Sequence, residues 1–163
     1  MRPSSYLDRA EKTMRIPEFL AEHQIAFETL LHPPAFSAQK RAKYLHVPGK
    51  QVVKAVLLHT PGGYILAVLP ATLHIDTLAL APFLPGPINL ATEDQIAEIF
   101  DDCEWGVVQP FGSLYGVPTI LEASIDPESQ IIFESHTHGA AVRMRCRDFE
   151  TLEHPRRLHF ATV

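Results

Sequence analysis

Short apolar segments alternate along the chain with polar ones, and proline or glycine separates most of them. Residues 51–60 (QVVKAVLLHT) are rich in β-branched and aliphatic side chains, which predicts a strand. Pro61-Gly62-Gly63 turns the chain into a second apolar segment over 64–70, so these two segments predict a hairpin. Further strands are predicted over 27–31, 106–110, 119–123, 130–135 and 142–147.

Helices are predicted where a capping residue or a proline stands at the edge of an apolar segment. The residues in these positions are Pro17, Ser37, Asp76, Thr92 and Asp148, and the helices expected after them cover 18–27, 38–47, 77–84, 96–100 and 149–153. This order of elements predicts a mixed α/β fold, a compact single domain in which short helices surround a largely antiparallel mixed sheet or barrel. Residues 1–13 lack periodicity and are predicted to form a loose leader ahead of one domain over 14–163.

Length, composition and charge exclude some classes of protein and favour others. A chain of 163 residues with 46% hydrophobic and 20% charged side chains favours one globular domain with its own core. A formal net charge of −5 disfavours a protein that coats long nucleic acid, but it allows a local basic patch for a few phosphates. There is no apolar run of the roughly 18 residues that a membrane span needs. Because there is also no secretory signal and no disulfide framework in Cys103 and Cys146, we expect a cytoplasmic protein without a membrane partner.

Familiar catalytic signatures such as G-x-S-x-G, H-E-x-x-H and the P-loop do not occur, so individual residues have to be considered. Lys54 is a lone cation in an apolar predicted strand. Its side chain either points to solvent or faces a pocket. Inside a pocket it needs an anion such as phosphate to offset the cost of burial.

Two further segments combine glycine with polar side chains. Residues 106–112 (GVVQPFG) are either a tight turn or a loop whose backbone approaches a ligand closely. His136 and His138 form an H-x-H pair, which ligates a metal only together with further ligands. A single catalytic or substrate-orienting histidine is therefore the favoured interpretation of this pair.

Basic side chains gather on the predicted helix over 38–47 and on the predicted strand over 142–147. Solvated faces are the ordinary explanation, and a rim that grips phosphates is the alternative. The residues concerned are Lys40, Arg41, Lys43, Arg143, Arg145 and Arg147.

In combination, these segments resemble a known family. VVKAVLL, LATEDQIAEIFDDCEWGVVQPFGSLYGVPTILEAS and IIFESHTHGAAVRM are similar to the YbaK/prolyl-tRNA-synthetase-associated family of aminoacyl-tRNA editing domains, over about residues 16–152. The most specific part is the combination of a strand lysine, a G-x-x-x-P loop and a downstream histidine. Members occur as a module inserted in bacterial prolyl-tRNA synthetases and as free-standing trans-editing proteins. The lack of synthetase catalytic and anticodon-binding segments in this sequence favours the free-standing type.

The resemblance implies roles for individual residues. Lys54 would contact the phosphate or terminal adenosine of the tRNA acceptor end. Gly106 and Pro110 would stand at the two ends of the loop whose backbone positions the scissile ester. His138 would help to define the aminoacyl pocket. His136 stands where the family usually has glycine, which bears on pocket size and substrate choice. The residues expected to contact substrate around these four are Val107, Val108, Gln109, Gly112, His136, His32 and Ser37, and neither a metal nor another cofactor is implied.

The expected function is therefore a trans-acting aminoacyl-tRNA deacylase, with the acceptor end of aminoacyl-tRNA as partner and a monomer or homodimer as assembly. An activated ester needs a positioned water and backbone donors more than a strong nucleophile, so the missing Ser-His-Asp set is no objection. Two alternatives stay open. One is a catalytically inactive tRNA- or nucleotide-binding module of the same fold, and the other is a metal-dependent hydrolase that uses His136, His138 and either His154 or His159.

Overall fold

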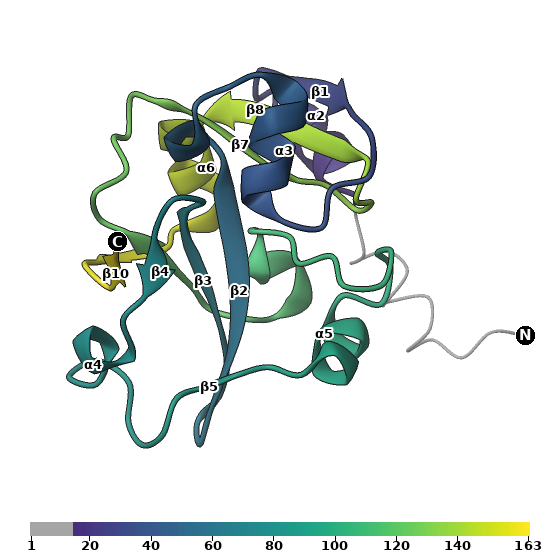
Figure 1. Ribbon diagram of the computed structural model, residues 1–163. Helices are drawn as coiled ribbons and strands as arrows, with labels where there is room; N and C mark the ends of the chain where they lie inside the picture. The colour runs from purple at the N-terminus through teal and green to yellow at the C-terminus, as the bar shows by residue number, and fades with distance from the viewer. Residues whose placement is uncertain (1–14) are drawn as a thin grey trace, which may run out of the picture.

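Two sheets form the framework of residues 15–163, the part of the chain that the computed structural model describes (Figure 1). The smaller sheet is antiparallel with the order β1–β8–β7, in which β1 is Phe27–Leu31, β7 is Gln130–Glu134 and β8 is Ala140–Arg145. The larger sheet has the order β5–β2–β3–β6–β9. Its strands are β2 (Val53–Thr60), β3 (Gly63–Pro70), β5 (Asn89–Leu90), β6 (Thr119–Glu122) and β9 (Arg156–Leu158).

The predicted hairpin is confirmed and forms the centre of the larger sheet. β2 and β3 pair antiparallel from Thr60 opposite Gly63 to Val53 opposite Pro70, and this register places Lys54 opposite Leu69. β6 runs parallel to β3 and β9 runs parallel to β6, so this sheet is mixed. A parallel bridge from Val52 to Ile132 links the start of β2 to the smaller sheet, and β4 (His74–Ile75) pairs with β10 (Ala161–Thr162).

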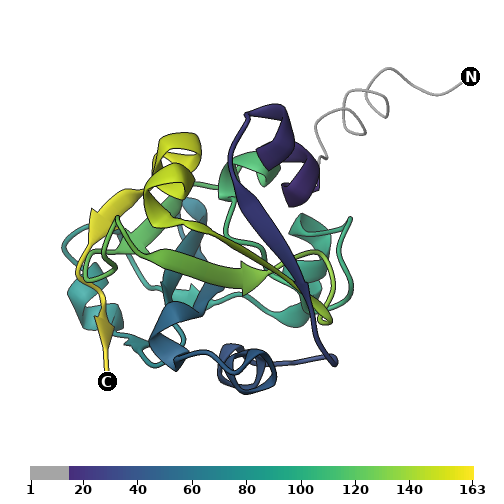
Figure 2. The ribbon, with the colours of Figure 1, turned by 90° about the horizontal axis from the view of Figure 1, so that it is seen from above.

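Helices cover both faces of the smaller sheet, as Figure 2 shows from above. α3 (Ala38–Leu45) packs against one face, where Ala38 and Ala42 meet Ile132 and Ala141. α2 (Ile16–Glu22) and α6 (Cys146–Glu153) pack against the other face. The remaining helical elements are α4 (Thr77–Leu80), α5 (Glu93–Ile99) and the 3₁₀ turns η1 (Gly49–Gln51) and η2 (Gly112–Tyr115).

Phenylalanine side chains hold the core on the α6 side together. The ring centroid of Phe111 lies 5.9 Å from that of Phe133 and 5.0 Å from that of Phe149, with near-perpendicular planes in both pairs. Each ring is almost fully buried, and full burial of such a side chain stabilises a fold by about 1.5–3 kcal/mol. Phe111 directly follows the loop 106–110, so this core fixes the end of the predicted ligand-approaching segment.

Three of the predicted helix caps are confirmed. The Ser37 hydroxyl accepts from the N–H of Lys40, and the Asp76 carboxylate accepts from the N–H of Leu78. Thr92 and Gln95 form the reciprocal capping box. Each of these signals lies within four residues of sequence, which is why the sequence predicts them well.

Two local predictions are wrong. Residues 106–110 form no strand, because Gly106 has φ +88° and the N–H of Val107 turns back to the carbonyl of Glu104. Asp148 does not cap a helix: β8 ends at Arg145, and α6 already begins at Cys146. The earlier start buries Cys146 in the core together with Phe149.

The predicted leader over 1–13 lies outside the described residues. Among the residues that the structure does describe, no helix has the length and apolar character that crossing a membrane requires. The prediction of a mixed α/β domain with short helices around the sheets is confirmed.

Candidate functional site

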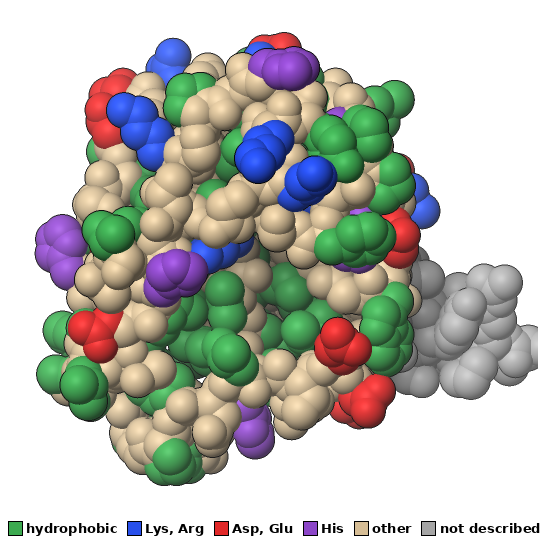
Figure 3. Space-filling model, in the orientation of Figure 1, with side chains coloured by type: hydrophobic (Ala, Val, Ile, Leu, Met, Phe, Trp, Pro, Cys, Tyr) green, Lys and Arg blue, Asp and Glu red, His purple; other side chains and the backbone are tan. Residues whose placement is uncertain are grey.

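A cavity of about 230 Å³ lies between α3, β2 and the loop 106–110. Figure 3 shows this face of the molecule, with a hollow beneath α3 whose depth is lined by hydrophobic side chains. The lining includes Lys54, Gly106, Pro110 and His138, the four residues that the sequence proposed for catalysis. Ser37 and Val108, two of the expected substrate contacts, line it as well. Four segments far apart in the sequence therefore meet at one cavity.

Lys54 faces this cavity from β2 rather than pointing away from the domain. Its Nζ lies 3.5 Å from the carbonyl oxygen of Ala71, and no carboxylate of residues 15–163 forms an ion pair with it. Partial burial lowers the pKa of the Lys54 ammonium, and no neighbouring anion opposes this shift. A half-buried cation that lacks a counter-ion is suited to receive an anionic ligand.

Gly106 provides a backbone conformation that other residues rarely adopt. Its φ of +88° lies in the left-handed region, and a Cβ at this position would lie 3.6 Å from His138 Nε2. Within residues 15–163, the N–H of Gly106 donates to no protein acceptor. A free backbone donor at the edge of a cavity is the kind of group that stabilises a developing oxyanion.

His138 is tied into the protein through both ring nitrogens. Nε2 lies 2.7 Å from the carbonyl oxygen of Trp105, and Nδ1 lies 2.7 Å from Oε1 of Glu134. The backbone N–H of His138 donates to the Glu104 carboxylate over 3.0 Å. Because a carbonyl can only accept, Nε2 carries a proton, and a second proton is held between Nδ1 and the Glu134 carboxylate. His138 therefore fastens the residues just before Gly106 to the turn after β7.

Glu134 and Arg41 complete this network, and sequence reasoning missed both. Arg41 Nη2 donates to Glu134 Oε1 and to the carbonyl of Ala35, each over 3.0 Å. Burial raises the pKa of Glu134, while Arg41 and His138 oppose that rise. Arg41 was grouped with the surface lysines, yet it shares the buried face of α3 with Ala38 and Ala42 at helical spacing. That spacing is the signal that could have found it.

A comparison with known protein families matches residues 32–152 to the aminoacyl-tRNA editing domain. The chain belongs to this family. The match confirms the family expected from the strand lysine, the G-x-x-x-P loop and the downstream histidine. A search of curated protein sequences finds no match to the chain.

Solved structures share the fold of this editing domain at low sequence identity. The hypothetical protein APE2540 superposes with a TM-score of 0.81 and 13% sequence identity. The match covers 91% of this chain and 100% of the APE2540 chain. A protein described as a proposed trans-editing enzyme for prolyl-tRNA synthetase superposes with a TM-score of 0.68 and 17% identity, covering 100% of this chain and 99% of its own. At these identities the likeness establishes the fold alone.

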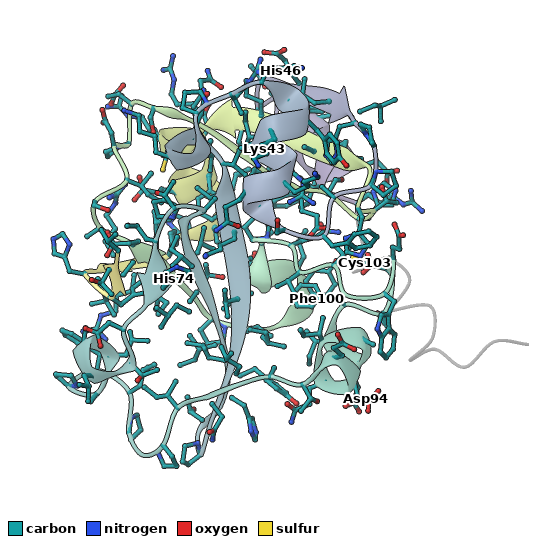
Figure 4. All side chains as sticks on the ribbon, in the orientation of Figure 1. Lys43, His46, His74, Asp94, Phe100 and Cys103 are labelled. Carbon is teal, nitrogen blue, oxygen red and sulfur yellow. The ribbon has the colours of Figure 1, made fainter. Side chains whose placement is uncertain are left out.

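In the structure, five of the expected substrate contacts lie outside the lining of the cavity. They are Val107, Gln109, Gly112, His136 and His32. Val107 is fully buried, and Gln109 Nε2 donates to Cys103 Sγ over 2.9 Å (Cys103 is labelled in Figure 4). Gly112 has no room for a side chain, since a Cβ there would lie 2.3 Å from the carbonyl oxygen of Val117. His32 Nδ1 is taken by the Pro33 carbonyl at 2.8 Å.

His136, which replaces the usual glycine, points to other partners. Its Nε2 lies 2.6 Å from Arg15 Nη1 and its Nδ1 lies 3.3 Å from the Ser135 hydroxyl. Desolvation and the Arg15 charge lower the pKa of His136, which favours the neutral ring. The sequence predicted an imidazole beside the aminoacyl group, and the structure instead directs it toward the start of α2.

We therefore expect His136→Gly to leave the amino-acid preference of the editing domain unchanged. The loss of the ring removes two partly exposed hydrogen bonds, to Arg15 and to the Ser135 hydroxyl, so the free energy of unfolding should fall by no more than about 2 kcal/mol. Relative hydrolysis rates on alanyl, seryl and prolyl esters measure the preference, and thermal melting measures the stability. A shift of the preference profile toward larger side chains would show that the ring does reach the aminoacyl group.

The basic strand does not form a free rim. Arg143 pairs with Glu28 at 3.3 Å. Arg147, which lies in α6 and not on the strand, pairs with Glu128, so two of the three arginines already have anionic partners. On α3, by contrast, Lys43 projects above the hollow (Figures 3 and 4), and Lys40 Nζ lies 5.1 Å from the centre of the Tyr44 ring. Over residues 15–163, no group of three or more His, Cys, Asp or Glu side chains is arranged to hold a metal ion.

Proposed function

We propose that this editing domain is a trans-acting deacylase that hydrolyses the ester of mischarged tRNA. The observation that carries the proposal is the meeting of three features at one cavity. Within residues 15–163, they are a cation at Lys54 without a carboxylate partner, a backbone donor at Gly106 without an acceptor, and a loop whose start is held by hydrogen bonds to His138. The acceptor end of an aminoacyl-tRNA supplies a phosphate that can bind the Lys54 ammonium and a scissile carbonyl that can accept from the Gly106 N–H.

The reaction needs water as its nucleophile. A water oxygen attacks the ester carbonyl, the oxyanion that forms accepts from the Gly106 N–H, and the bond to the ribose oxygen then breaks. The ribose oxygen takes up the proton that the water loses, so that free amino acid and uncharged tRNA are released. Cys103 is unsuited as a nucleophile, because burial raises the pKa of its thiol to about 12 and the residue lies outside the cavity lining.

The size of the cavity favours small aminoacyl groups. Its volume of about 230 Å³ lies below the roughly 300–1,000 Å³ of sites that enclose drug-sized ligands. A pocket of this kind discriminates by excluding large side chains, as the second sieve of an editing system does. A cytoplasmic location, where charged tRNA is found, and the acceptor end as the binding partner follow from this function.

A panel of mischarged tRNAs tests the proposal. We expect the protein to release free amino acid from at least one of the Ala, Ser, Cys, Thr and Pro esters, and to leave a phenylalanyl ester intact as the size control. If none of the five small esters is hydrolysed while aminoacyl-tRNA still binds saturably, the domain is a binding module. That outcome would replace the proposed deacylase.

A further inference from the structure

Arg41, Glu134 and His138 form a continuous buried network, which we call the buried triad. It runs from α3 through the end of β7 to the turn before β8. Arg41 is 3% exposed and His138 is 6% exposed. Arg41 and His138 both reach the same oxygen, Oε1 of Glu134, at 3.0 and 2.7 Å. The carboxylate is therefore the centre of the network.

Fold stability does not explain these charges. Removing an ion pair from water costs several kcal/mol per charge, and apolar side chains of similar volume commonly serve a core as well or better. The face of α3 on either side of Arg41 is built from alanines, Ala38 and Ala42, which pack on Ile132 and Ala141. A buried arginine in such a face indicates a task that an apolar residue cannot perform.

The network acts on the peptide unit between Trp105 and Gly106, which His138 contacts directly. Its carbonyl accepts from His138 Nε2, and in a trans peptide the N–H on the same plane points the opposite way. The hydrogen bond at the carbonyl also polarises the peptide and makes its N–H a stronger donor. That N–H belongs to Gly106 and has no acceptor within residues 15–163.

We propose that Arg41 and Glu134 are positioning residues which, through His138, orient and polarise the Gly106 N–H for the oxyanion of the proposed deacylation. Arg41 favours the charged form of Glu134 and holds the carboxylate in place. Glu134 holds the His138 ring with a proton directed at the Trp105 carbonyl. The N–H of Val108 also faces the Glu134 carboxylate, so the loop is held on both sides of Gly106. The inference rests on the proposed function for its catalytic part only.

A double variant, Arg41→Met with Glu134→Gln, tests this inference. It removes the charges of Arg41 and Glu134 together at nearly constant volume, so that neither of these two is left buried without the other. The control is Arg143→Met with Glu28→Gln, which removes a surface pair at 3.3 Å between β8 and β1. If the double variant fails to fold, the isosteric Glu134→Gln variant alone is measured in the same way.

Two measurements are made on each variant. In the triad variant we expect kcat to fall about 10- to 100-fold with KM changed less than about twofold, because the oxyanion exists only in the transition state. We also expect faster hydrogen exchange at residues 104–110 and no change at the β2–β3 hairpin. Restoring glutamate in the Arg41→Met background should recover part of kcat.

The outcomes separate this inference from the proposed function. An unchanged kcat, or a rise of KM alone, overturns the positioning role even if the wild type is a deacylase. Wild-type exchange rates at 104–110 in the triad variant overturn it as well. If the wild type hydrolyses no ester, the proposed function fails, and faster exchange at 104–110 still supports the triad as the element that holds this loop.

Discussion

Replacing Lys54 by methionine is expected to lower the deacylation rate about 10- to 100-fold without lowering the melting temperature. A hydrogen bond to a charged group contributes about 1.5–3 kcal/mol, and each 1.4 kcal/mol or so corresponds to about tenfold in rate. Methionine keeps the length of the stem on β2 and removes only the ammonium. The rate measured under single-turnover conditions on the best ester of the panel reports the loss.

The stability side of this prediction follows from the pKa of Lys54. Burial lowers that pKa, so the folded protein holds the proton less tightly than the unfolded chain does. The ammonium therefore costs stability below its folded pKa, and this cost is relieved as the pH rises from the folded pKa to the ordinary value of 10.5. Methionine removes the cost at neutral pH. Because the side chain is only half-buried, the gain in melting temperature should be small.

Lys50→Met is the matched control for this variant. Lys50 is exposed on η1 and lies outside the cavity beneath α3. It should retain the wild-type rate. A Lys54→Met protein with a rate within about twofold of wild type would mean that no substrate anion binds the ammonium.

Sequence patterns predicted the elements whose cause is local. The β2–β3 hairpin follows from two apolar segments around Pro61-Gly62-Gly63, and the caps at Ser37 and Thr92 bond within three residues. The start of α6 was misplaced because its position depends on tertiary contacts. The N–H of Cys146 donates to the carbonyl of Ser129, 17 positions earlier, and no local signal specifies that contact.

The residues of the candidate site were likewise predictable only where their signal is local. Lys54 was identifiable because a cation in an apolar strand is unusual, but whether it faced solvent or a pocket depended on α3 and the loop 106–110. Helical spacing could have marked Arg41 as buried, but its pairing with Glu134 was not identifiable from the sequence, since the two are joined only by the packing of α3 on the smaller sheet. Sequence reasoning thus named the unusual residues and missed their partners.

Hydrogen bonds to carboxylates anchor the loop between Gly106 and Gly112 near both of its ends. At its start, Glu104 accepts from the backbone N–H of His138 over 3.0 Å. At its end, Glu153 of α6 accepts from the N–H of Ser113 over 3.0 Å and from the Thr119 hydroxyl over 2.6 Å. Glu153 is 8% exposed. The second anchor joins α6, η2 and β6, so it supports the domain as well as the loop.

Glu153→Ala is expected to lower the free energy of unfolding by about 2–4 kcal/mol, because it leaves the part-buried Ser113 N–H and the buried Thr119 hydroxyl without an acceptor. For a domain of this size that corresponds to a fall in melting temperature of roughly 5–15 °C. Thr151→Ala, at an exposed position of the same helix, is the control and should change stability by less than about 0.5 kcal/mol. A loss of equal size in both variants would place the effect in the helix rather than in the anchor.

Glu153→Gln separates the charge of this anchor from its hydrogen bonds. Burial raises the pKa of Glu153 above its ordinary value of 4.5, although the bonds from Ser113 and Thr119 oppose the rise. The folded state then holds the proton more tightly than the unfolded chain, so stability is lost as the pH rises from 4.5 through the folded pKa. Glutamine does not titrate. The stability of wild type relative to Glu153→Gln, measured by denaturant unfolding, should therefore fall as the pH is raised from about 4 to about 7. If the stability of wild type relative to Glu153→Gln instead rises with pH, the hydrogen bonds outweigh burial and hold the carboxylate in its charged form.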